Sequence, residues 1–383
     1  MYNFSFYNPV KIIFGKSTIS KLSKEISQNN KIMLIYGSGS IKKNGVYQQV
    51  TDALKNFEYV EFSGIEANPH YETCMNCVEK IKTEKVNFLL AVGGGSVIDA
   101  TKFIAAAAMV EGDAWKIMTG ELRVEKALPF ATVLTLPATA SEMNKGAVIT
   151  KAETLEKFAF HSEKVYPKFS ILDPETTYSL PKIQIANGII DTFVHVTEQY
   201  LTTNENAKIQ DYFAESILKV LIEESSKVFE NPLDYDTRAN LMWASTWGLN
   251  GWIGQGNTED WATHLIGHEL TAFHGIDHGQ TLAIILPGVM KIMKNEKREK
   301  ILQMGKNVFG INEKDENIAI DLTINAVDKF FQSLEIKTHL KDYNVDNDSI
   351  IKIVNRFKER GWLLGEHENI NPEIIEEILL ERL

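Results

Sequence analysis

Hydrophobic and polar positions follow one pattern in the first half of the chain and another in the second. Up to residue 180, short apolar runs rich in β-branched residues alternate with amphipathic stretches. This alternation is typical of βα units that build a parallel sheet. It predicts buried strands at residues 31–36, 87–92 and 130–136, and helices at residues 17–29 and 45–57.

Beyond residues 170–181 the pattern becomes helical. Long amphipathic segments follow one another, and extended runs of alternating β-branched residues nearly vanish. The chain has 383 residues, more than a single hydrophobic core ordinarily serves. We therefore predict an α/β domain over residues 1–180 and an all-helical domain over residues 181–383, with the boundary near Pro181.

Composition and charge narrow the class of protein. The chain is 44% hydrophobic and 24% charged, as in a soluble globular protein. Its net charge of −11 argues against binding to nucleic acid or to an anionic membrane surface. The longest apolar run, near residues 103–110, is far too short to span a membrane, and the first residues lack the features of a signal peptide. We expect a cytoplasmic enzyme with no nucleic-acid or membrane partner.

The two cysteines, Cys74 and Cys77, form a CxxC motif. No second pair completes a tetrahedral zinc site, and the motif lies inside a predicted helix, whereas redox pairs usually stand at a helix start. We interpret both as small apolar residues on a helix.

Residues 88–108 combine a buried strand, a triple glycine and a helix. Gly93–Gly95 would allow close backbone approach and positive φ, and the helix N-terminus offers N–H groups suited to a phosphate. The segment is not the GxGxxG fingerprint of dinucleotide-binding folds. Ser96 and Asp99 would also form a capping box, which by itself explains both residues. Nucleotide binding and simple helix capping both remain open.

A second loop, residues 37–40, follows the predicted strand 31–36 in the same way. An acid that reads the 2′-hydroxyl of NAD would stand at the end of such a strand. None is present, and Lys42 and Lys43 follow closely. This favours NADP(H) over NAD(H), although an ordinary Gly/Ser turn with exposed lysines explains the pattern too.

A third loop ends the predicted strand 130–136. Thr135, Thr139 and Ser141 offer hydroxyls to a ribose or a phosphate. The same hydroxyls are equally able to satisfy only local backbone groups.

Asp191 and His195 stand four residues apart in an apolar helical segment. This spacing places both side chains on one face of a helix, near enough to share an ion. A carboxylate and an imidazole suit Fe²⁺, Zn²⁺ or Mn²⁺. The pair alone is a weak signal, but an aspartate buried in an apolar helix must be paired or bind a ligand.

Four of the nine histidines lie within residues 261–280. His264 and His268 share one face of a helix that should end near Gly275, and His278 begins the next turn. His264 and His278 can therefore flank one point, and with Asp191 and His195 they form a set of one carboxylate and three imidazoles. Position 272 is not histidine, so the segment is not the zinc-protease HExxH motif. We assign His274 no ligand role.

Three tryptophans precede the histidines: Trp243, Trp247 and Trp252. They would suit the wall of an apolar substrate pocket. Packing in a helical core is the commoner reason for such residues.

With these residues placed, the chain resembles the iron-containing (group III) alcohol dehydrogenases, and most closely their NADPH-dependent aldehyde reductase and butanol dehydrogenase branch. The resemblance covers essentially the whole chain and rests on six segments in order: FYNPVKIIFGKSTISKL, GGGSVIDATK, LTLPATASE, ILDPETTYSLP, NGIIDTFVHVTEQY and WATHLIGHELTAFHGIDHG. It implies a dehydroquinate-synthase-like fold, with an α/β nucleotide-binding domain followed by an all-α domain.

The resemblance also implies roles for individual residues. The metal ligands would be Asp191, His195, His264 and His278, with His268 near the metal without being a ligand. The cofactor-binding positions would be Gly37, Ser38, Gly39, Ser40, Asn68, Gly94, Gly95, Ser96, Asp99, Thr135, Thr139 and Lys157. One departure is Ala140, where the family usually has glycine between the threonine and serine. If that position needs a positive φ, alanine is strained there.

The implied activity is hydride transfer between NADP(H) and a short- to medium-chain primary alcohol or aldehyde of the butanol type. One Fe²⁺ or Zn²⁺ ion is expected, in a homodimer. His268 is our candidate for the catalytic proton transfer, with a purely positioning role as the alternative. Three other activities stay open: an NAD-dependent polyol dehydrogenase of the glycerol type, a non-redox metal-dependent hydrolase and a metal sensor.

Overall fold

The computed structural model describes all residues from 1 to 383, which form two compact units. The α/β unit contains Tyr7–Leu180 and Asn231–Thr246. The helical unit contains Met1–Phe6, Pro181–Glu230 and Trp247–Leu383. One boundary falls between Leu180 and Pro181, as in a division of the chain into 1–180 and 181–383. Two segments depart from that division: Met1–Phe6 belongs to the helical unit, and Asn231–Thr246 belongs to the α/β unit.

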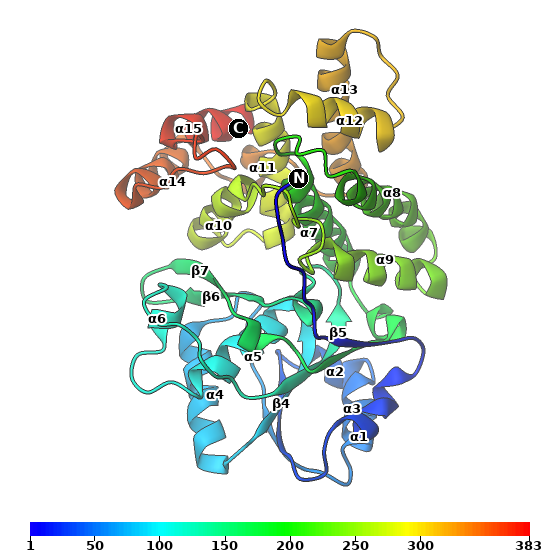
Figure 1. Ribbon diagram of the computed structural model, residues 1–383, viewed down its shortest axis with the longest axis vertical. Helices are drawn as coiled ribbons and strands as arrows, with labels where there is room; N and C mark the ends of the chain where they lie inside the picture. Colours follow the sequence, from blue (N-terminus) through cyan, green and yellow to red (C-terminus); the bar gives the residue numbers. More distant parts are fainter. The chain divides into compact units, whose positions relative to one another are not determined.

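A six-stranded parallel sheet forms the centre of the α/β unit (Figure 1). The strand order is β1-β8-β5-β4-β2-β3, and the bounds are β1 Lys11–Phe14, β2 Lys31–Tyr36, β3 Glu58–Phe62, β4 Phe88–Gly94, β5 Phe130–Leu136 and β8 Phe169–Leu172. The predicted strands 31–36, 87–92 and 130–136 are confirmed as β2, β4 and β5. A separate antiparallel hairpin joins β6 Gly146–Lys151 to β7 Glu156–His161.

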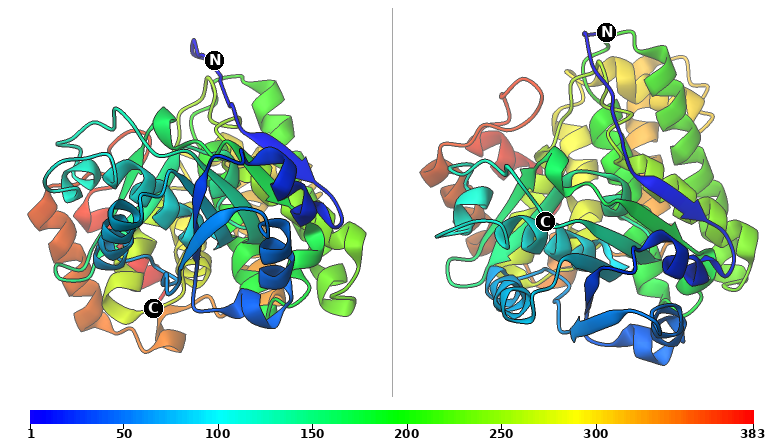
Figure 2. Two further views of the ribbon diagram at one scale, coloured as in Figure 1. Left: turned by 90° about the horizontal axis from the view of Figure 1, so that it is seen from below. Right: turned by 60° about the horizontal axis from the view of Figure 1, so that its bottom comes forward.

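Helices cover both faces of this sheet (Figure 2). Along β2, Met33 and Ile35 pack in one core and Ile32 and Leu34 in the other, as the two-residue period of a strand requires. The first core includes residues of α4 and α5, and the second includes residues of α1 and α3. The bounds are α1 Leu22–Glu25, α2 Ser40–Lys43, α3 Val46–Ala53, α4 Tyr71–Glu84, α5 Gly95–Ala107 and α6 Trp115–Met118, with 3₁₀ turns η1 Thr18–Lys21, η2 Ser141–Met143, η3 Glu163–Val165 and η4 Pro174–Thr177.

The predicted helix at residues 17–29 is largely wrong. Only a 3₁₀ turn and one α-helical turn form there, and Ile26 is already extended. The serine hydroxyls of this segment donate to nearby backbone carbonyls, from Ser20 to Ser17 O and from Ser23 to Ser20 O. Such local bonds compete with a regular helix.

The cysteines pack as the sequence predicts. Cys74 and Cys77 lie on α4, unpaired and fully buried in the hydrophobic core of the α/β unit. Burial raises the pKa of both thiols, to about 12 for Cys77. A protonated thiol is a poor nucleophile and a poor metal ligand. The burial of both side chains on a helix in the core confirms the predicted packing role.

The helical unit holds no β-strand. Its helices are α7 Lys182–Tyr200, α8 Lys208–Glu230, α10 Ala262–His274, α11 His278–Ile292, α12 Arg298–Asn307, α13 Glu316–Ser333, α14 Asn347–Arg360 and α15 Pro372–Glu381, with the 3₁₀ turn η5 Leu340–Tyr343. The helix α9 Tyr235–Gly248 runs across the boundary of the two units. From Gly188 to Tyr200, every residue of α7 is buried. This central helix packs against α8, α10 and α11.

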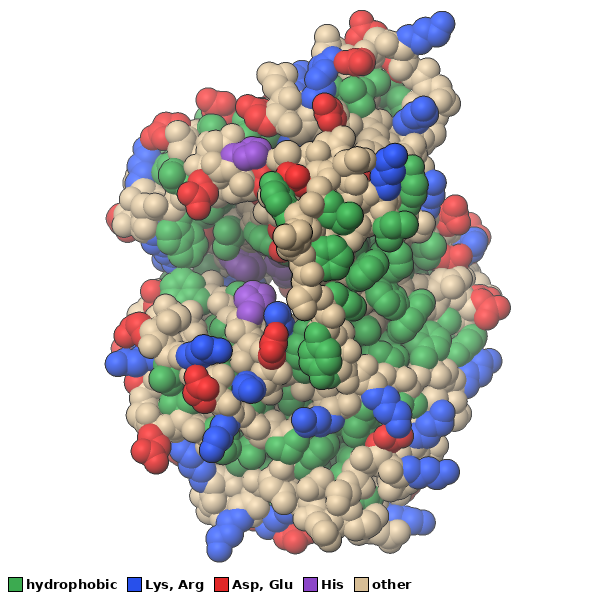
Figure 3. Space-filling view, viewed as in Figure 1, with side chains coloured by type: hydrophobic (Ala, Val, Ile, Leu, Met, Phe, Trp, Pro, Cys, Tyr) green, Lys and Arg blue, Asp and Glu red, His purple; other side chains and the backbone are tan.

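The surface mixes charges of both signs on the face that Figure 3 shows. On this face, the acidic side chains of a chain with net charge −11 are interspersed with basic ones. None of the helices combines the length and the apolar composition that crossing a bilayer would need.

Ala140 has a positive φ, the case in which the sequence analysis expects alanine to be strained. Its φ is 50° and its ψ is 19°, in the left-handed region, and its side chain is fully buried. Only glycine adopts this conformation without steric cost. The residue nevertheless begins the turn η2, where Met143 N–H donates to Ala140 O at 2.8 Å.

Replacing Ala140 by glycine is expected to stabilise the α/β unit by about 0.5–1 kcal/mol. Relief of left-handed strain contributes about 1–2 kcal/mol, and the greater unfolded-state entropy of glycine offsets part of it. Denaturant unfolding monitored by circular dichroism measures the effect. Ala138→Gly, in the same loop but without positive φ, is the control and should destabilise the unit. Equal signs for the two variants would contradict the strain argument.

Candidate functional site

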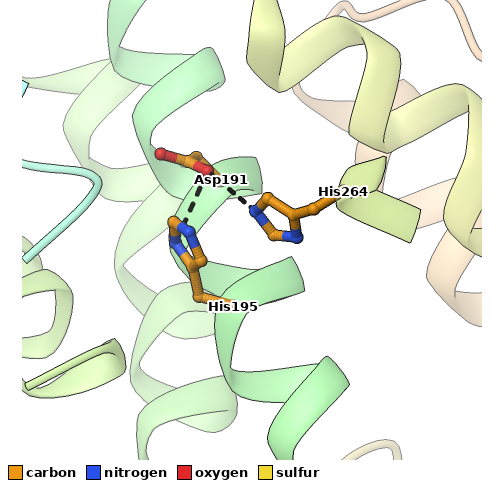
Figure 4. A group of neighbouring side chains, drawn as sticks. All are labelled: Asp191, His195 and His264. Atoms are coloured by element: carbon orange, nitrogen blue, oxygen red, sulfur yellow. Dashed lines mark ion pairs between the residues drawn. The ribbon is translucent and has the colours of Figure 1, made fainter. Parts of the chain in front are cut away.

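The four predicted metal ligands meet inside the helical unit. Asp191 and His195 project from α7 and His264 from α10 (Figure 4). His278 is the first residue of α11. One oxygen, Asp191 Oδ1, lies 3.4 Å from His195 Nδ1, 3.7 Å from His264 Nε2 and 3.5 Å from His278 Nε2. Residues nearly ninety positions apart in the sequence therefore converge on one point.

The atoms at this point fit a divalent metal. The ligand atoms of Asp191, His195 and His264 lie within 4.8 Å of one another, and all three residues are buried. Asp191 Oδ1 and His264 Nε2 have no hydrogen-bond partner although they are shielded from water. Buried polar atoms are rarely left unsatisfied. A carboxylate with imidazoles is a ligand set that suits Fe²⁺ or Zn²⁺.

Electrostatics inside the cluster keep the carboxylate charged. Burial tends to raise the pKa of Asp191, but His195, His264 and His278 outweigh it and hold that pKa well below its usual range. For His264 the signs are reversed: burial lowers its pKa, and the carboxylates of Glu198 and Asp191 raise it. The net result is a pKa of about 9. The metal-free cluster thus holds a proton that an incoming metal ion must displace.

Glu198 is a member of the site that the sequence interpretation missed. It is buried on α7, and its carboxylate contacts His264 Nδ1, the ring nitrogen that faces away from Asp191. Burial raises the pKa of this carboxyl group, and the contact with His264 works in the opposite direction. Its position offered a signal, since it follows His195 by three residues and Asp191 by seven and so shares their helix face.

The two remaining histidines of the segment, His268 and His274, lie in different surroundings. His268 is buried one turn after His264, and its ring centre lies 5.4 Å from that of His278 and 6.4 Å from that of His264. His274 is the last residue of α10, which Gly275 ends with a left-handed backbone at φ 67°. The predicted end of this helix near Gly275 is confirmed.

The tryptophans suggested as pocket walls pack elsewhere. Trp243 contacts Phe14, Trp247 contacts Phe213 and Trp252 contacts Phe6, with ring centres 5.6, 5.3 and 5.2 Å apart. The aromatic residue beside the ligands is instead Trp261, whose ring centre is 6.3 Å from that of His195 and 5.4 Å from that of His264. None of the three contacts involves a predicted metal ligand, and Trp243 is exposed rather than buried in a core.

The three predicted cofactor loops lie together in the α/β unit. They follow β2, β4 and β5, which are parallel and adjacent in the sheet. The carboxyl ends of adjacent parallel strands share one edge, where open α/β sheets bind their ligands. Residues 37–40, 94–99 and 135–141 are thereby brought to the same edge.

The triple glycine serves close approach, and the expectation of positive φ is wrong. None of Gly93, Gly94 and Gly95 has a positive φ. A Cβ on Gly93 would come within 2.5 Å of Val97, and one on Gly95 would overlap the side chain of Thr139. The loop after β5 thus rests directly on the backbone at the N-terminus of α5, a helix start that can receive a phosphate.

The capping box that the sequence suggested for Ser96 and Asp99 does not form. The helix α5 begins at Gly95 with Gly94 as its cap residue, and no side chain caps it. Ser96 donates its hydroxyl to Ala67 O. Asp99 accepts from Ser141 Oγ at 2.5 Å and from Val148 N–H at 2.9 Å. The carboxylate of Asp99 therefore ties α5 to the loop after β5 and to β6.

Two further predicted cofactor positions, Asn68 and Lys157, lie in contact although they are distant in sequence. Lys157 Nζ, on β7, donates to Asn68 Oδ1 at 3.2 Å. Thr139 Oγ1 accepts from Ser141 N–H at 3.2 Å, so part of its capacity serves the local backbone. Thr135 is buried near the end of β5.

An acid does stand near the first loop, on the neighbouring strand. Glu61 on β3 accepts from Tyr36 Oη at 2.6 Å and from Tyr47 Oη at 2.7 Å, and Lys42 Nζ lies 3.7 Å from it. Both tyrosines lower the pKa of Glu61, against the effect of burial, and Lys42 lowers it further. The sequence correctly predicts no acid after β2, but it does not reveal this carboxylate, whose two oxygens both accept tyrosine hydroxyls.

Comparisons with known proteins identify the family and the fold. The family described as iron-containing alcohol dehydrogenase matches residues 9–174, and its C-terminal domain matches residues 185–383. The NADPH-dependent aldehyde reductase YqhD of Escherichia coli (strain K12) is 50% identical over 98% of both chains. The crystal structure of Escherichia coli K-12 YqhD superposes with a TM-score of 0.98 at 48% identity, covering 100% of this chain and 99% of the other.

A relative that uses the other cofactor is more distant. NADH-dependent butanol dehydrogenase A of Clostridium acetobutylicum is 37% identical over 99% of both chains. The predicted family and the predicted fold, an α/β domain followed by an all-helical domain, are confirmed by these comparisons.

Removing one ligand is expected to abolish metal binding. Asp191→Ala leaves three imidazoles without their common carboxylate, and His278→Ala removes one of four donors. Elemental analysis of the purified variants should find iron and zinc below about one tenth of the wild-type content, because losing one ligand at a four-ligand site typically costs several kcal/mol.

The control is His274→Ala, on the same helix as His264 but outside the cluster, which should keep its metal. Wild-type metal content in Asp191→Ala or His278→Ala would show that the ligand set is wrong.

Proposed function

The chain belongs to the iron-containing alcohol dehydrogenase family, and we propose that it interconverts short- to medium-chain aldehydes and primary alcohols with NADP(H). The observation that carries this proposal is the convergence of one carboxylate and three imidazoles on a single buried point. The glycine-rich edge of the parallel sheet supplies the second requirement, a place for a dinucleotide.

NADP(H) is favoured over NAD(H) by the charges near the first loop. No acid follows β2, and the one nearby carboxylate, Glu61, is engaged by two tyrosines and Lys42. Lys42 and Lys43 stay close to the loop as cations for a 2′-phosphate. The name of the relative that is 50% identical, an NADPH-dependent aldehyde reductase, points the same way.

The side chains of the helical unit have defined tasks in this proposal. Asp191, His195, His264 and His278 hold Fe²⁺ or Zn²⁺, and Trp261 packs against two of the imidazoles and keeps water from them. When bound, the ion supplies Lewis acidity that polarises a carbonyl group or lowers the pKa of an alcohol. NADPH supplies the hydride.

Reduction of an aldehyde also needs a proton at the substrate oxygen, and we assign its delivery to His268. The ring of His268 lies beside His278 and one helical turn from His264. Imidazole exchanges protons near neutral pH. The alternative role for His268 is to hold the ring of His278 in place.

We further propose that the protein works in the cytoplasm as a homodimer with no nucleic-acid or membrane partner. The acidic net charge agrees with this expectation. Exposed hydrophobic side chains of the helical unit, at Met1, Tyr2, Phe4, Ile209 and Tyr212, offer surface for a second copy. Sedimentation analysis of the purified protein tests the oligomeric state.

Metal-loaded protein is expected to oxidise NADPH when two- to eight-carbon aldehydes are supplied, with kcat/KM at least about ten-fold higher than with NADH. One charge-assisted hydrogen bond to the 2′-phosphate contributes about 1.5–3 kcal/mol, which is enough for such a ratio. Absorbance at 340 nm measures both reactions, and chelator-treated protein with and without added Fe²⁺ or Zn²⁺ is the control.

Equal efficiency with NADH would refute the cofactor assignment. Full activity after complete metal removal would refute the metal role. Ester or amide hydrolysis without dinucleotide binding would favour a hydrolase, and turnover only of polyols with NAD would favour a glycerol-type dehydrogenase.

A further inference from the structure

We propose that Glu198 is the positioning residue of the metal centre, which sets the orientation and the tautomer of the His264 ring. This inference rests on the proposed metal-dependent function. It concerns a residue that touches no substrate and acts only through His264.

The carboxylate of Glu198 connects two helices. Glu198 lies on α7, in the turn after His195, and both of its oxygens accept from the start of α10. Oε1 accepts from Thr263 N–H at 2.6 Å, and Oε2 contacts His264 Nδ1. All three residues are buried, so water does not compete for these bonds.

This pair of contacts determines which nitrogen of His264 carries the proton. A carboxylate that is charged has only acceptor oxygens, so the nitrogen that touches it must be the one that bears hydrogen. In the neutral ring that a metal ion requires, Nδ1 then holds the proton and Nε2 keeps its lone pair. Nε2 is the nitrogen that points at Asp191 Oδ1, 3.7 Å away, and it has no hydrogen-bond partner.

A second buried acid stands at the same helix start, but its charge is compensated elsewhere. Asp260 accepts from Ala262 N–H at 2.7 Å and pairs with Lys297 Nζ at 2.7 Å. Lys297 also binds Glu366 Oε2 and Leu201 O, each at 2.8 Å. Two carboxylates thus accept from the backbone at the N-terminus of α10. Asp260 is paired with Lys297, whereas Glu198 contacts the His264 ring.

A backbone hydrogen bond also joins the segment before α10 to α7. Asp260 N–H donates to Glu198 O at 2.9 Å, so the segment before α10 is anchored on α7 independently of the Glu198 side chain. Removing the charge of Glu198 should therefore change the ring of His264 more than the position of the helix.

The decisive variant is Glu198→Gln. A glutamine has the same shape, but its amide carries one acceptor oxygen and one donor NH₂ group. It can accept from Thr263 N–H or from His264 Nδ1–H, not from both. If the NH₂ group meets His264, the ring must carry its proton on Nε2, the nitrogen needed by the metal.

We expect the dissociation constant for Zn²⁺ to rise about 10- to 100-fold in Glu198→Gln, the range found when partners of metal-bound histidines are removed. Competition with a chromophoric chelator measures this constant. Absorption spectra of the Co²⁺-loaded proteins report the ligand geometry, and we expect the visible bands of the variant to differ from those of the wild type.

The matched control is Glu269→Gln on α10, the helix that carries His264. Glu269 is also buried, but its carboxylate binds Arg356 at 2.9 Å and Arg360 at 2.6 Å and touches no metal ligand. This variant should lose thermal stability and keep its Zn²⁺ dissociation constant within about two-fold of the wild type. An equal loss of affinity in both variants would show a general structural effect and overturn the proposal.

A measurement on the unaltered protein keeps the inference testable if Glu198→Gln does not fold. In Zn²⁺-loaded protein labelled with ¹⁵N-histidine, His264 should show a protonated Nδ1 and a metal-bound Nε2 in ¹H–¹⁵N correlation spectra. A metal-bound Nδ1, or wild-type affinity in Glu198→Gln, would overturn the role of Glu198 while leaving the proposed function intact. Absence of any metal binding by the wild-type protein would instead refute the proposed function.

Discussion

The burial of one carboxylate among three imidazoles is the constraint on which the helical unit depends. A charged group removed from water is costly unless it is paired, and Asp191 lies in the most buried helix of that unit. Imidazoles from three helices lie within 3.7 Å of its Oδ1, because α10 and α11 pack against α7. The same arrangement leaves Asp191 Oδ1 and His264 Nε2 without hydrogen bonds. The unsatisfied buried atoms that make the cluster energetically costly in the metal-free protein are thus also what makes it a candidate metal site.

The α/β unit meets a different constraint, which is the room needed at the edge of its sheet. A side chain at Gly95 would overlap Thr139, and one at Gly93 would overlap Val97. Small residues there let the loop after β5 and the start of α5 lie close together. Asp99 and Lys102 then anchor that contact from within α5, the first to Ser141 and Val148, the second to Asn144 and Gly146. The backbone N–H groups at this helix start remain available to a phosphate.

Several elements followed directly from local patterns. The strands β2, β4 and β5 are runs of apolar residues whose two faces are both buried, so their hydrophobicity alone predicts them. The C-terminal end of α10 and the start of α11 follow from Gly275 and from histidine spacing. The segment after β1 did not follow from its pattern. The apolar period predicts a long helix there, but serine hydroxyls donate to backbone carbonyls three residues earlier and weaken it. The capping box failed for a similar reason, since Asp99 has tertiary partners that outcompete the local one.

The sequence by itself determined the fold class and the family, and it predicted a set of metal ligands, because periodicity, spacing and residue chemistry are local properties. Tertiary structure alone decided which buried groups those ligands contact. Glu198 looks like any acid on a helix until α10 packs against α7 and places His264 Nδ1 against its carboxylate. Glu61 looks unrelated to the first loop until β3 pairs with β2. A charged side chain acquires its role from the partner that lies within a few ångströms, and that partner is set by packing between segments far apart along the chain.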